Sequence, residues 1–257
     1  MPVLRFFFSS RRSGVKTMPP VTGVAMSAIS PSMLYPQVQN KLLRYLSAEE
    51  QTILFAQAEI IQLNFAEQLC QPGELYEYVY FPLTAFISLI AKLPNHPALE
   101  MGLIGYEGML GVTTLLHTRR VPSEAIVQGS GIAWRIPITT FEDLLSQNIN
   151  LKLIFQEYLY KLLCQLSQNA VCAYFHSVES RLARWLLMSH DRIQTNELYL
   201  THQFLADMLG VRRSSITVAA GDLQACGMIS YNRGRINILD RQGLLDRCCS
   251  CYHSMRA

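Results

Sequence analysis

Residues 201–229 read THQFLADMLGVRRSSITVAAGDLQACGMI, and this stretch decides how the C-terminal part of the chain folds. Leu205 and Leu209 share one apolar helical face, and the small Ala206 allows a second helix to cross closely. Gly210 predicts a tight turn between the helices, because glycine adopts backbone conformations that other residues avoid. The pattern therefore predicts two short helices joined by a turn.

The second helix of this pair separates apolar residues from residue types that contact DNA. Its apolar side consists of Ile216, Ala219, Ala220 and Leu223, and its polar start consists of Arg212, Arg213, Ser214, Ser215 and Thr217. Arginine and hydroxyl side chains bind phosphates and base edges. A helical hairpin within a protein core is the alternative interpretation. Polar residues gathered at one helix start favour a helix-turn-helix, whose second helix enters the major groove.

A β-hairpin is predicted directly after the second helix. Its strands lie near residues 228–231 and 235–239, and residues 232–234 form the turn. A helix at residues 176–190 precedes the helix pair and is expected to scaffold it. A helix-turn-helix followed by a hairpin is a winged helix, so we expect a winged-helix DNA-binding domain at residues 176–253.

Composition limits the class of protein. The chain has 257 residues, of which 50% are hydrophobic, so it can bury a full core. A run of about 18 apolar residues, which a membrane-spanning helix needs, does not occur, and no membrane contact is expected. The net charge is only +3, and the basic excess lies in residues 1–30 and in the C-terminal third. That distribution agrees with a nucleic-acid partner.

The N-terminal stretch and the cysteines indicate a cytoplasmic protein. Residues 1–30 are basic and lack acids, but their apolar run is too short for a secretory signal, so we expect a disordered tail. The seven cysteines are an odd number and are dispersed through apolar patterns. This favours reduced thiols over a disulfide framework.

Short apolar runs broken by Gly, Pro and Asn follow a predicted amphipathic helix at residues 41–55. The runs lie at residues 78–81, 85–90, 98–104, 125–128 and 132–137. Regular short strands at this interval predict a compact β-barrel or β-roll, which we assign to residues 34–145. Together with the helices, this gives an α+β fold.

The pattern becomes helical from Phe141 to about Phe175 and is longer than an average globular helix. Apolar residues at heptad spacing predict a dimer seam at residues 146–175, formed by Phe155, Leu159, Leu162, Leu166, Asn169 and Ala173. The polar Asn169 would favour a defined register and two strands. The alternative is a long helix lying on the roll through a second face, formed by Leu151, Ile154 and Tyr158. Both can hold at once.

The order of these parts resembles the Crp/Fnr family of bacterial transcription regulators, from about Leu34 to His253. Further likenesses are Gly73-Glu-Leu, Val79-Tyr-Phe-Pro and Glu179-Ser-Arg-Leu-Ala-Arg-Trp-Leu-Leu. The resemblance implies a β-roll like the cyclic-nucleotide-binding domain, a long dimerisation helix and a C-terminal winged helix. It also implies a homodimer that binds a palindromic site in double-stranded DNA and acts on RNA polymerase.

The resemblance also implies roles for individual residues. Thr201, His202 and Gln203 would lie near phosphates at the start of the first helix. Arg213, Ser214 and Thr217 would face bases, Arg212 and Ser215 would lie nearby, and Arg233 and Arg235 would lie on the wing. Ser214 stands where the best-known members carry a glutamate, so we expect a different preferred half-site.

The roll departs from the family's cyclic-nucleotide sensors. Where they carry a Gly-Glu pair and an Arg-Ser/Thr-Ala run, this chain has Gly111-Val112 and Ser123-Glu124-Ala125. Both ligand-holding charges are missing, and Glu124 would repel a phosphate, although Arg119 and Arg120 could reach in from a loop. We therefore expect no cyclic nucleotide and no cofactor. The roll either binds an unidentified apolar or weakly polar effector or only supports the dimer.

Four soft ligands near the C-terminus are a candidate zinc or redox site: Cys248, Cys249, Cys251 and His253. Ligands so close in sequence rarely complete one tetrahedron, and thiols of a terminal helix are the simpler interpretation. The sequence has no H-E-x-x-H or nucleophile-elbow pattern, and no carboxylate pair with supporting context, so an enzyme is not expected. The alternative function is a ligand-binding or scaffold protein whose winged helix mediates protein contacts.

Overall fold

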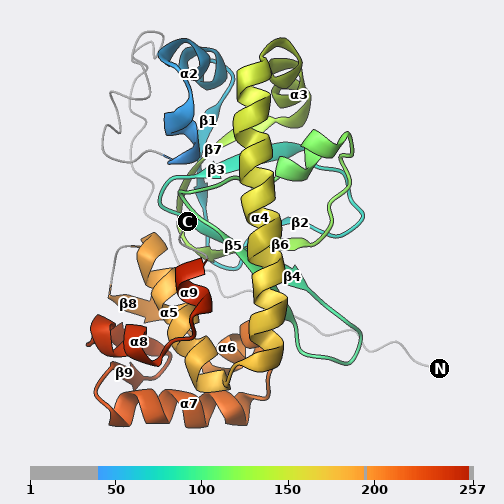
Figure 1. Ribbon diagram of the computed structural model, residues 1–257. Helices are drawn as coiled ribbons and strands as arrows, with labels where there is room; N and C mark the ends of the chain where they lie inside the picture. Colours follow the sequence, from blue (N-terminus) through green and yellow to red (C-terminus); the bar gives the residue numbers. More distant parts are fainter. Residues whose placement is uncertain (1–39, 194–195, 255–257) are drawn as a thin grey trace, which may run out of the picture. The chain divides into compact units, whose positions relative to one another are not determined.

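Short strands between Glu59 and Pro137 form the β-roll of this computed structural model, as their spacing predicts (Figure 1). The structure describes residues 40–193 and 196–254, which lie in one compact unit, and the expected tail at residues 1–30 falls outside them. The strands are β1 (Glu59–Leu63), β2 (Gln68–Cys70), β3 (Tyr78–Pro82), β4 (Phe86–Ala91), β5 (Leu99–Ile104), β6 (Glu124–Gly129) and β7 (Gly131–Pro137). They form two antiparallel sheets, in the orders β1-β7-β3 and β2-β6-β4-β5.

The larger sheet is buried on both faces, and each face belongs to a different hydrophobic core. Neighbouring side chains of a strand point to opposite faces. On β4, Ile87 and Leu89 pack inside the roll. Phe86 and Ile90 point the other way, into a second core that the C-terminal helices complete. The sheet is therefore a shared wall between the two cores.

The N-terminal helix is divided, which corrects the single helix predicted at residues 41–55. The structure has a 3-10 helix η1 (Leu42–Tyr45) and an α-helix α2 (Ala48–Phe55). Ser47 starts α2 as its cap. Its Oγ accepts a hydrogen bond from the Glu50 amide at 3.2 Å, while its own amide donates to the Glu50 carboxylate at 2.7 Å. This reciprocal pair favours a helix start at Ser47 over a continuous helix.

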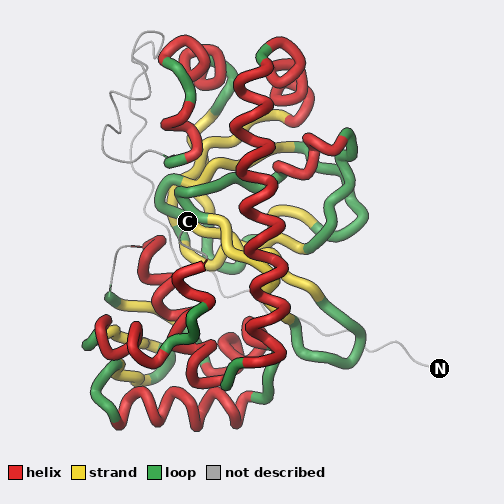
Figure 2. The backbone as a smooth tube through the Cα atoms, viewed as in Figure 1, coloured by secondary structure: helices red, strands yellow, loops and turns green. Residues whose placement is uncertain are grey.

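The helical region at residues 141–175 is also divided, at Asn148. Helix α3 (Ile138–Gln147) ends there, and the 27-residue helix α4 (Ile149–Phe175) begins. The Asn148 side chain accepts hydrogen bonds from the amides of Asn150 and Leu151, at 3.0 and 3.2 Å. Asparagine is a preferred helix cap, which explains the break. Figure 2 shows α4 as one uninterrupted helix.

The C-terminal part is a winged helix built on helix α5 (Val178–Ile193). The remaining elements are β8 (Glu197–Tyr199), α6 (His202–Leu209), α7 (Arg213–Ala225), β9 (Ile229–Asn232), β10 (Arg235–Ile238), α8 (Arg241–Arg247) and α9 (Cys251–Ser254). The hairpin β9–β10 agrees with the sequence prediction. Strand β8, which the sequence analysis missed, pairs with β10 and makes a three-stranded sheet in the order β8-β10-β9.

The second core joins the helix pair to α5 and to the roll. The predicted apolar faces of α6 and α7 are buried in it, including Leu205 and Ile216, neither of which is exposed. Trp185 of α5 is 1% exposed, and its Nε1 donates to Glu100 of β5 at 3.0 Å. The helix-turn-helix therefore rests on α5, and α5 rests on the outer face of the roll's larger sheet.

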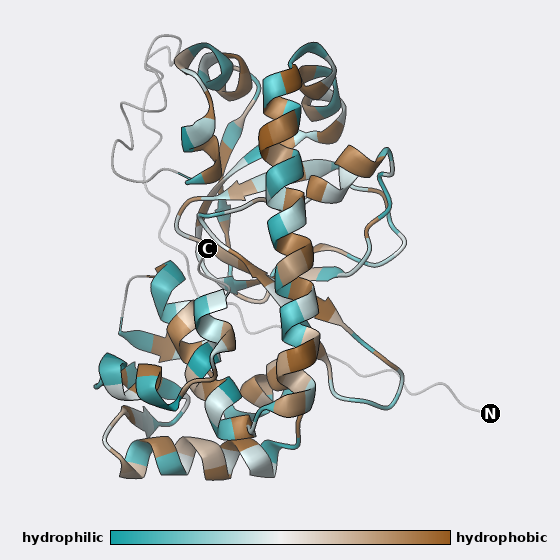
Figure 3. Ribbon diagram, in the orientation of Figure 1, coloured by the Kyte–Doolittle hydropathy of each residue, from teal (hydrophilic) through white to brown (hydrophobic). Residues whose placement is uncertain are grey.

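Hydrophobic residues recur along the whole length of α4 (Figure 3). Even so, no helix in the described part of the chain is long and apolar enough to cross a membrane.

Candidate nucleic-acid interface

The first helix of the pair, α6, is capped and held by short-range contacts. Thr201 Oγ1 accepts a hydrogen bond from the Phe204 amide at 3.1 Å. Gln203 donates to the Asp207 carboxylate at 3.0 Å, one turn further on. Gly210 ends α6 with a φ of +63°, in the left-handed region that favours glycine. Thr201 and Gln203 are exposed at the helix start, where the sequence analysis expected them.

The second helix, α7, starts without a side-chain cap. Arg212 occupies the cap position and makes no capping hydrogen bond. The first amides of a helix have no partner within it, and they give its start a partial positive charge. Arg213 and Ser214 are exposed at this start, and Ser215 is half-buried beside them. The start of α7 is therefore arranged to attract an anion.

His202 and Thr217 connect the two helices and the wing. His202 Nδ1 lies 3.0 Å from Thr217 Oγ1, and the Thr217 hydroxyl donates to the Arg213 carbonyl at 3.1 Å. The His202 ring also stacks on Tyr231 of β9, with centroids 4.3 Å apart. Burial lowers the pKa of His202, and the charge of Arg213 lowers it further. These residues hold the interface together, and the Thr217 hydroxyl already has partners inside the protein.

The wing presents one of its two predicted arginines freely. Arg233 and Gly234 have φ angles of +48° and +84°, which give a tight two-residue turn between β9 and β10. Arg233 is exposed at the tip of this turn. Arg235 is held instead by β8, because its guanidinium lies 3.6 Å from the Glu197 carboxylate and 5.1 Å from the Tyr199 ring centroid.

Charge pairing separates the arginines of this part of the chain into two groups. Among the described residues, Arg212, Arg213 and Arg233 make no ion pair. Others pair with acids, as Arg247 does with Glu179 at 3.1 Å. The unpaired arginines lie at two places: Arg212 and Arg213 at the uncapped start of α7, and Arg233 at the tip of the wing.

The exposed face of α7 contains residues that the sequence analysis missed. Val218 is 64% exposed although it is apolar, and it lies one turn after Ser214. A β-carbon added to Gly221 would meet open space, so this part of the face is shallow. Exposed apolar side chains on such a helix can contact the methyl group of thymine. The i, i+4 spacing of Ser214 and Val218 was the signal that could have identified this face.

The residues at the positions of the nucleotide-holding charges serve the roll itself. Gly111 has a φ of +96°, and Val112 and Ala125 are buried in the roll's core. Ser123 is half-buried. The Glu124 carboxylate is bound by Lys92 at 2.5 Å and by the Gln68 side chain.

The two arginines of the neighbouring loop are also engaged. Arg119 forms an ion pair with Glu142 of α3. Arg120 donates to the Gly73 carbonyl at 3.3 Å. The structure therefore does not bring either arginine to Ser123 or Val112.

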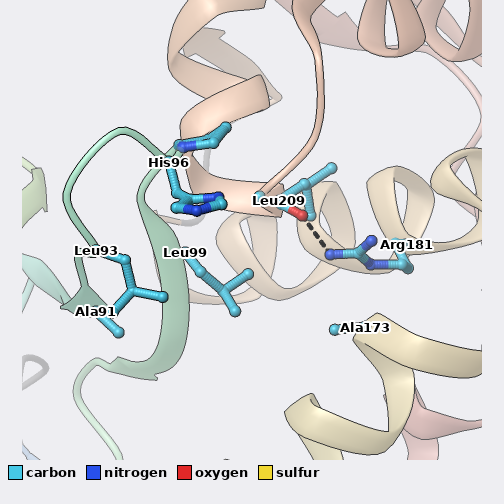
Figure 4. Close-up of a pocket in the computed structure, with 9 residues that line it drawn as sticks. Ala91, Leu93, His96, Leu99, Ala173, Arg181 and Leu209 are labelled. Carbon is cyan, nitrogen blue, oxygen red and sulfur yellow. Dashed lines mark hydrogen bonds between the residues drawn. The ribbon is translucent and has the colours of Figure 1, made fainter.

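A cavity of about 280 Å³ lies where the β4–β5 hairpin approaches the turn of the helix-turn-helix (Figure 4). Arg181 is its charged residue, and it donates a hydrogen bond to the Leu209 carbonyl. A β-carbon on Gly210 would come within 2.9 Å of Leu99 Cδ1, so the hairpin packs closely on the turn. The lining residues are Ala91, Leu93, His96, Pro97, Leu99, Ala173, Arg181, Leu209 and Gly210.

The predicted dimer seam lies against the chain itself, which corrects its assignment to a partner. Phe155, Leu159 and Leu162 are buried in the roll's core, with Leu166 packed against it. Asn169 donates to the Met101 carbonyl at 2.5 Å and accepts from Arg184 at 2.7 Å. The remaining seam residue, Ala173, lines the cavity beside Arg181. The second face is also turned inward, with Leu151 and Tyr158 buried and Ile154 partly buried.

The exposed side of α4 has its own heptad pattern, which we call the outer stripe. Its large apolar members are strongly exposed, from 53% at Leu163 to 83% at Tyr174. The outer stripe is Ile149, Leu153, Gln156, Tyr160, Leu163, Ser167, Ala170 and Tyr174, all exposed. It lies one residue out of step with the predicted seam, and one residue corresponds to about 100° of rotation around a helix. It therefore occupies a neighbouring face, which the chain leaves exposed.

The four candidate metal ligands are divided by the structure. Cys249 and Cys251 are buried and face the end of α4, whereas Cys248 is half-buried and His253 is exposed. Cys248 Sγ donates to the Leu245 carbonyl at 3.2 Å. Of the four candidates, only Cys249 and Cys251 lie close together. Two residues from a distant part of the sequence lie beside them.

Known proteins share both the domain and the fold. Residues 180–247 match the family model described as the Crp-like helix-turn-helix domain. A curated relative, the global nitrogen regulator of Synechocystis sp., is 25% identical over 177 residues, which cover 65% of this chain and 78% of the relative. A protein of Nostoc sp. with the same name is also 25% identical, over 65% of this chain and 79% of its own.

Solved structures extend the likeness to both parts of the fold. FixK2 from Bradyrhizobium japonicum matches with a TM-score of 0.63 and 14% identity, over 75% of this chain and 98% of its own. A Crp/Fnr-family transcriptional regulator from Thermus thermophilus matches with a TM-score of 0.58 and 20% identity, over 74% and 97%. The chain therefore has a Crp-like helix-turn-helix domain at residues 180–247, and its β-roll, long helix and winged helix share the fold of a solved Crp/Fnr-family regulator.

Proposed function

We propose that the chain binds a palindromic DNA site as a homodimer and regulates transcription by RNA polymerase there. The observation that carries this proposal is the set of unpaired arginines at the open start of α7 and at the wing tip. Arg213 would donate to a guanine edge in the major groove, with Ser214 and Val218 beside it. Arg212 and Arg233 would bind phosphates.

The outer stripe of α4 supports the dimer. A soluble chain that exposes apolar residues at heptad spacing gains stability when a second copy covers them. A two-fold dimer through this stripe would relate two α7 helices by the same axis, and paired reading helices bind paired half-sites. The predicted seam residues do not take part, because their own chain already covers them.

The roll would not respond to a cyclic nucleotide. Such a ligand needs a cation for its phosphate, but the matched position carries the carboxylate of Glu124. This carboxylate is already bound by Lys92 and Gln68. Thermal unfolding in the presence of cyclic AMP tests this, because a ligand that binds only the folded state raises the melting temperature. We expect no shift. A clear shift would overturn this part of the proposal and leave the DNA-binding part standing.

The test of DNA binding begins with selection of bound sequences from a random library. Since two relatives are named global nitrogen regulators, promoters of nitrogen genes are natural fragments to add. Binding of the selected site is then compared between the unaltered chain and Arg213→Ala. Loss of one base-reading arginine should weaken binding by about 10- to 100-fold. The matched control is Arg119→Ala, which removes a paired arginine of the roll and should leave binding unchanged.

Salt distinguishes DNA binding from a winged helix that contacts proteins. Binding through phosphates should fall steeply as salt rises, because the contacts release counterions. Arg233→Ala should reduce that slope by about one unit. Equal binding by Arg213→Ala and the unaltered chain, or a partner insensitive to salt, would contradict the proposal and favour the protein-contact alternative.

A further inference from the structure

Three cysteines and one histidine meet where the end of α4 touches the C-terminus of the described chain. Cys172 lies in the last turn of α4, and His176 is the residue that ends this helix. Cys251 is the first residue of α9, and Cys249 lies two residues before it. The four ligand atoms, three Sγ and one imidazole nitrogen, all lie within 4.8 Å of one another. In Figure 1, α4 is yellow and α9 is red, because α4 comes before the winged helix in the sequence and α9 lies at its end.

The spacing of these atoms suits a tetrahedral metal ion. Zinc bonds of about 2.3 Å to sulfur and about 2.0–2.1 Å to nitrogen place the ligand atoms of a tetrahedron about 3.5–3.8 Å apart. Cys172 Sγ lies 3.5 Å from Cys249 Sγ, and Cys251 Sγ lies 3.5 Å from His176 Nδ1. Contraction of the longest edge of the cluster, which is at most 4.8 Å, by about 1.3 Å or less completes the geometry.

The surroundings also favour a bound ion. Cys172, Cys249 and Cys251 form a small buried cluster with no larger apolar side chain in it, so it does not resemble an ordinary core. The Gln168 side chain donates to Cys251 Sγ at 3.0 Å, which would orient that ligand from outside. Arg181 and Arg184 lie near enough to affect the cysteine thiols and would offset the charge of three thiolates.

A disulfide is the main alternative, and the geometry favours it less. It would join only two of the three cysteines and leave the third thiol and the imidazole unused. It would also require Cys172 and Cys249 to approach from 3.5 Å to about 2.05 Å. A site that uses all four groups accounts for more of the arrangement.

We propose that Cys172, His176, Cys249 and Cys251 bind one Zn²⁺ ion that fastens the C-terminal helix to the end of α4. Three sulfur ligands and one imidazole are typical of closed, structural zinc sites. Binding converts the thiols to thiolates and releases their protons to solvent. The site is separate from the start of α7, so it does not depend on the proposed DNA binding.

The first test uses the full chain, reduced and freed of metal, with Co²⁺ as the probe. One equivalent should produce the strong visible bands of tetrahedral cobalt and near-ultraviolet bands from thiolate ligands, and Zn²⁺ should remove them. Zn²⁺ should also raise the melting temperature. This measurement needs no altered residue. A spectrum without thiolate bands, or no saturation at one ion per chain, would overturn the proposal.

The second test compares ligands with matched neighbours outside the cluster. Cys249→Ser and His176→Ala each remove one ligand, so Zn²⁺ binding should weaken by more than the about 10- to 100-fold typical of residues that only orient ligands. Cys248→Ser and His253→Ala are the controls and should bind like the unaltered chain. Loss of binding in the controls, or a Cys172–Cys249 disulfide in the freshly isolated chain that excludes the metal, would refute the site.

Discussion

The inner and outer faces of α4 carry similar apolar residues at the same heptad spacing, but the chain covers only one of them. On the inner face, Phe155 is fully buried between Phe81 and Phe141, with ring centroids 5.8 and 5.3 Å away. On the outer face, Leu153 is 55% exposed. Heptad spacing therefore identifies a surface that needs a partner, but it does not say whether the partner is the same chain or another copy.

Replacement of the buried phenylalanine should reveal the largest difference in stability between the inner and outer faces. Phe155→Ala should lower the free energy of unfolding by about 3–5 kcal/mol, because it leaves a cavity in the roll's core. Urea unfolding at several chain concentrations measures this. Leu153→Ala is the matched change on the outer face and should alter subunit stability by about 0.5 kcal/mol or less. Similar losses in both variants would contradict the division into a covered and an open face.

A charge on the outer stripe should act on self-association instead. Leu163→Glu places two carboxylates opposite each other in a symmetric dimer, which should weaken association by about 100-fold, or about 2.7 kcal/mol. Sedimentation equilibrium gives the association constant. Leu116→Glu changes a leucine of the roll that is 61% exposed and should leave association unchanged. If Leu163→Glu dimerises normally, the outer stripe is not the interface.

A buried carboxyl group of β5, close to the polar end of the inner face of α4, should make stability depend on pH. Glu100 lies beside Met101, which accepts from Asn169 of α4, and burial raises the Glu100 pKa from 4.5 to about 7. The folded state then holds a proton that the unfolded state releases. The contribution of Glu100 to stability should therefore be greatest below about pH 4.5 and fall by about 2.5 kcal/mol as the pH rises to 7.

Glu100→Gln isolates this effect. An uncharged amide can still accept from Trp185 Nε1, so urea unfolding of the variant should lose most of that pH dependence between pH 4.5 and 7. An unchanged slope would show that another group causes it.

The smallest effect is expected from the polar member of the outer stripe. Gln156→Leu adds apolar area between Leu153 and Tyr160 and should tighten self-association by a few-fold, or about 1 kcal/mol. Gln147→Leu, at the exposed end of α3, is the control. The dimer constant of both variants, measured as for Leu163→Glu, decides whether the stripe is continuous through residue 156. A weaker dimer in Gln156→Leu would place the contact elsewhere on the helix.

Local patterns predicted much of the fold because their causes are local. The buried face of α7, from Ile216 to Leu223, follows from helical spacing, and the strands of the roll follow from short apolar runs. The two divided helices carried signals that were present but unused. Ser47 and Glu50 form a capping box, and Asn148 is a typical cap before Ile149.

The sites depended on contacts between distant segments, which sequence patterns do not contain. Cys172 and Cys249 lie 77 residues apart, so the cysteine cluster could not be read from the crowded C-terminal ligands alone. The pairing of Arg235 with Glu197 required strand β8, which the sequence analysis missed. Val218 was overlooked because an apolar residue on a helix is usually assigned to the core.

The shared wall of the roll has a consequence for how the molecule unfolds. Phe86, Ile90 and Leu103 belong to the larger sheet, but they complete the core beneath the helix pair. A fragment that starts at Val178 would lose these side chains and expose the apolar surface that they cover. The helix-turn-helix part is therefore not a module that can be cut out intact. Denaturation of the described chain should proceed as one cooperative transition, without a separate step for either half.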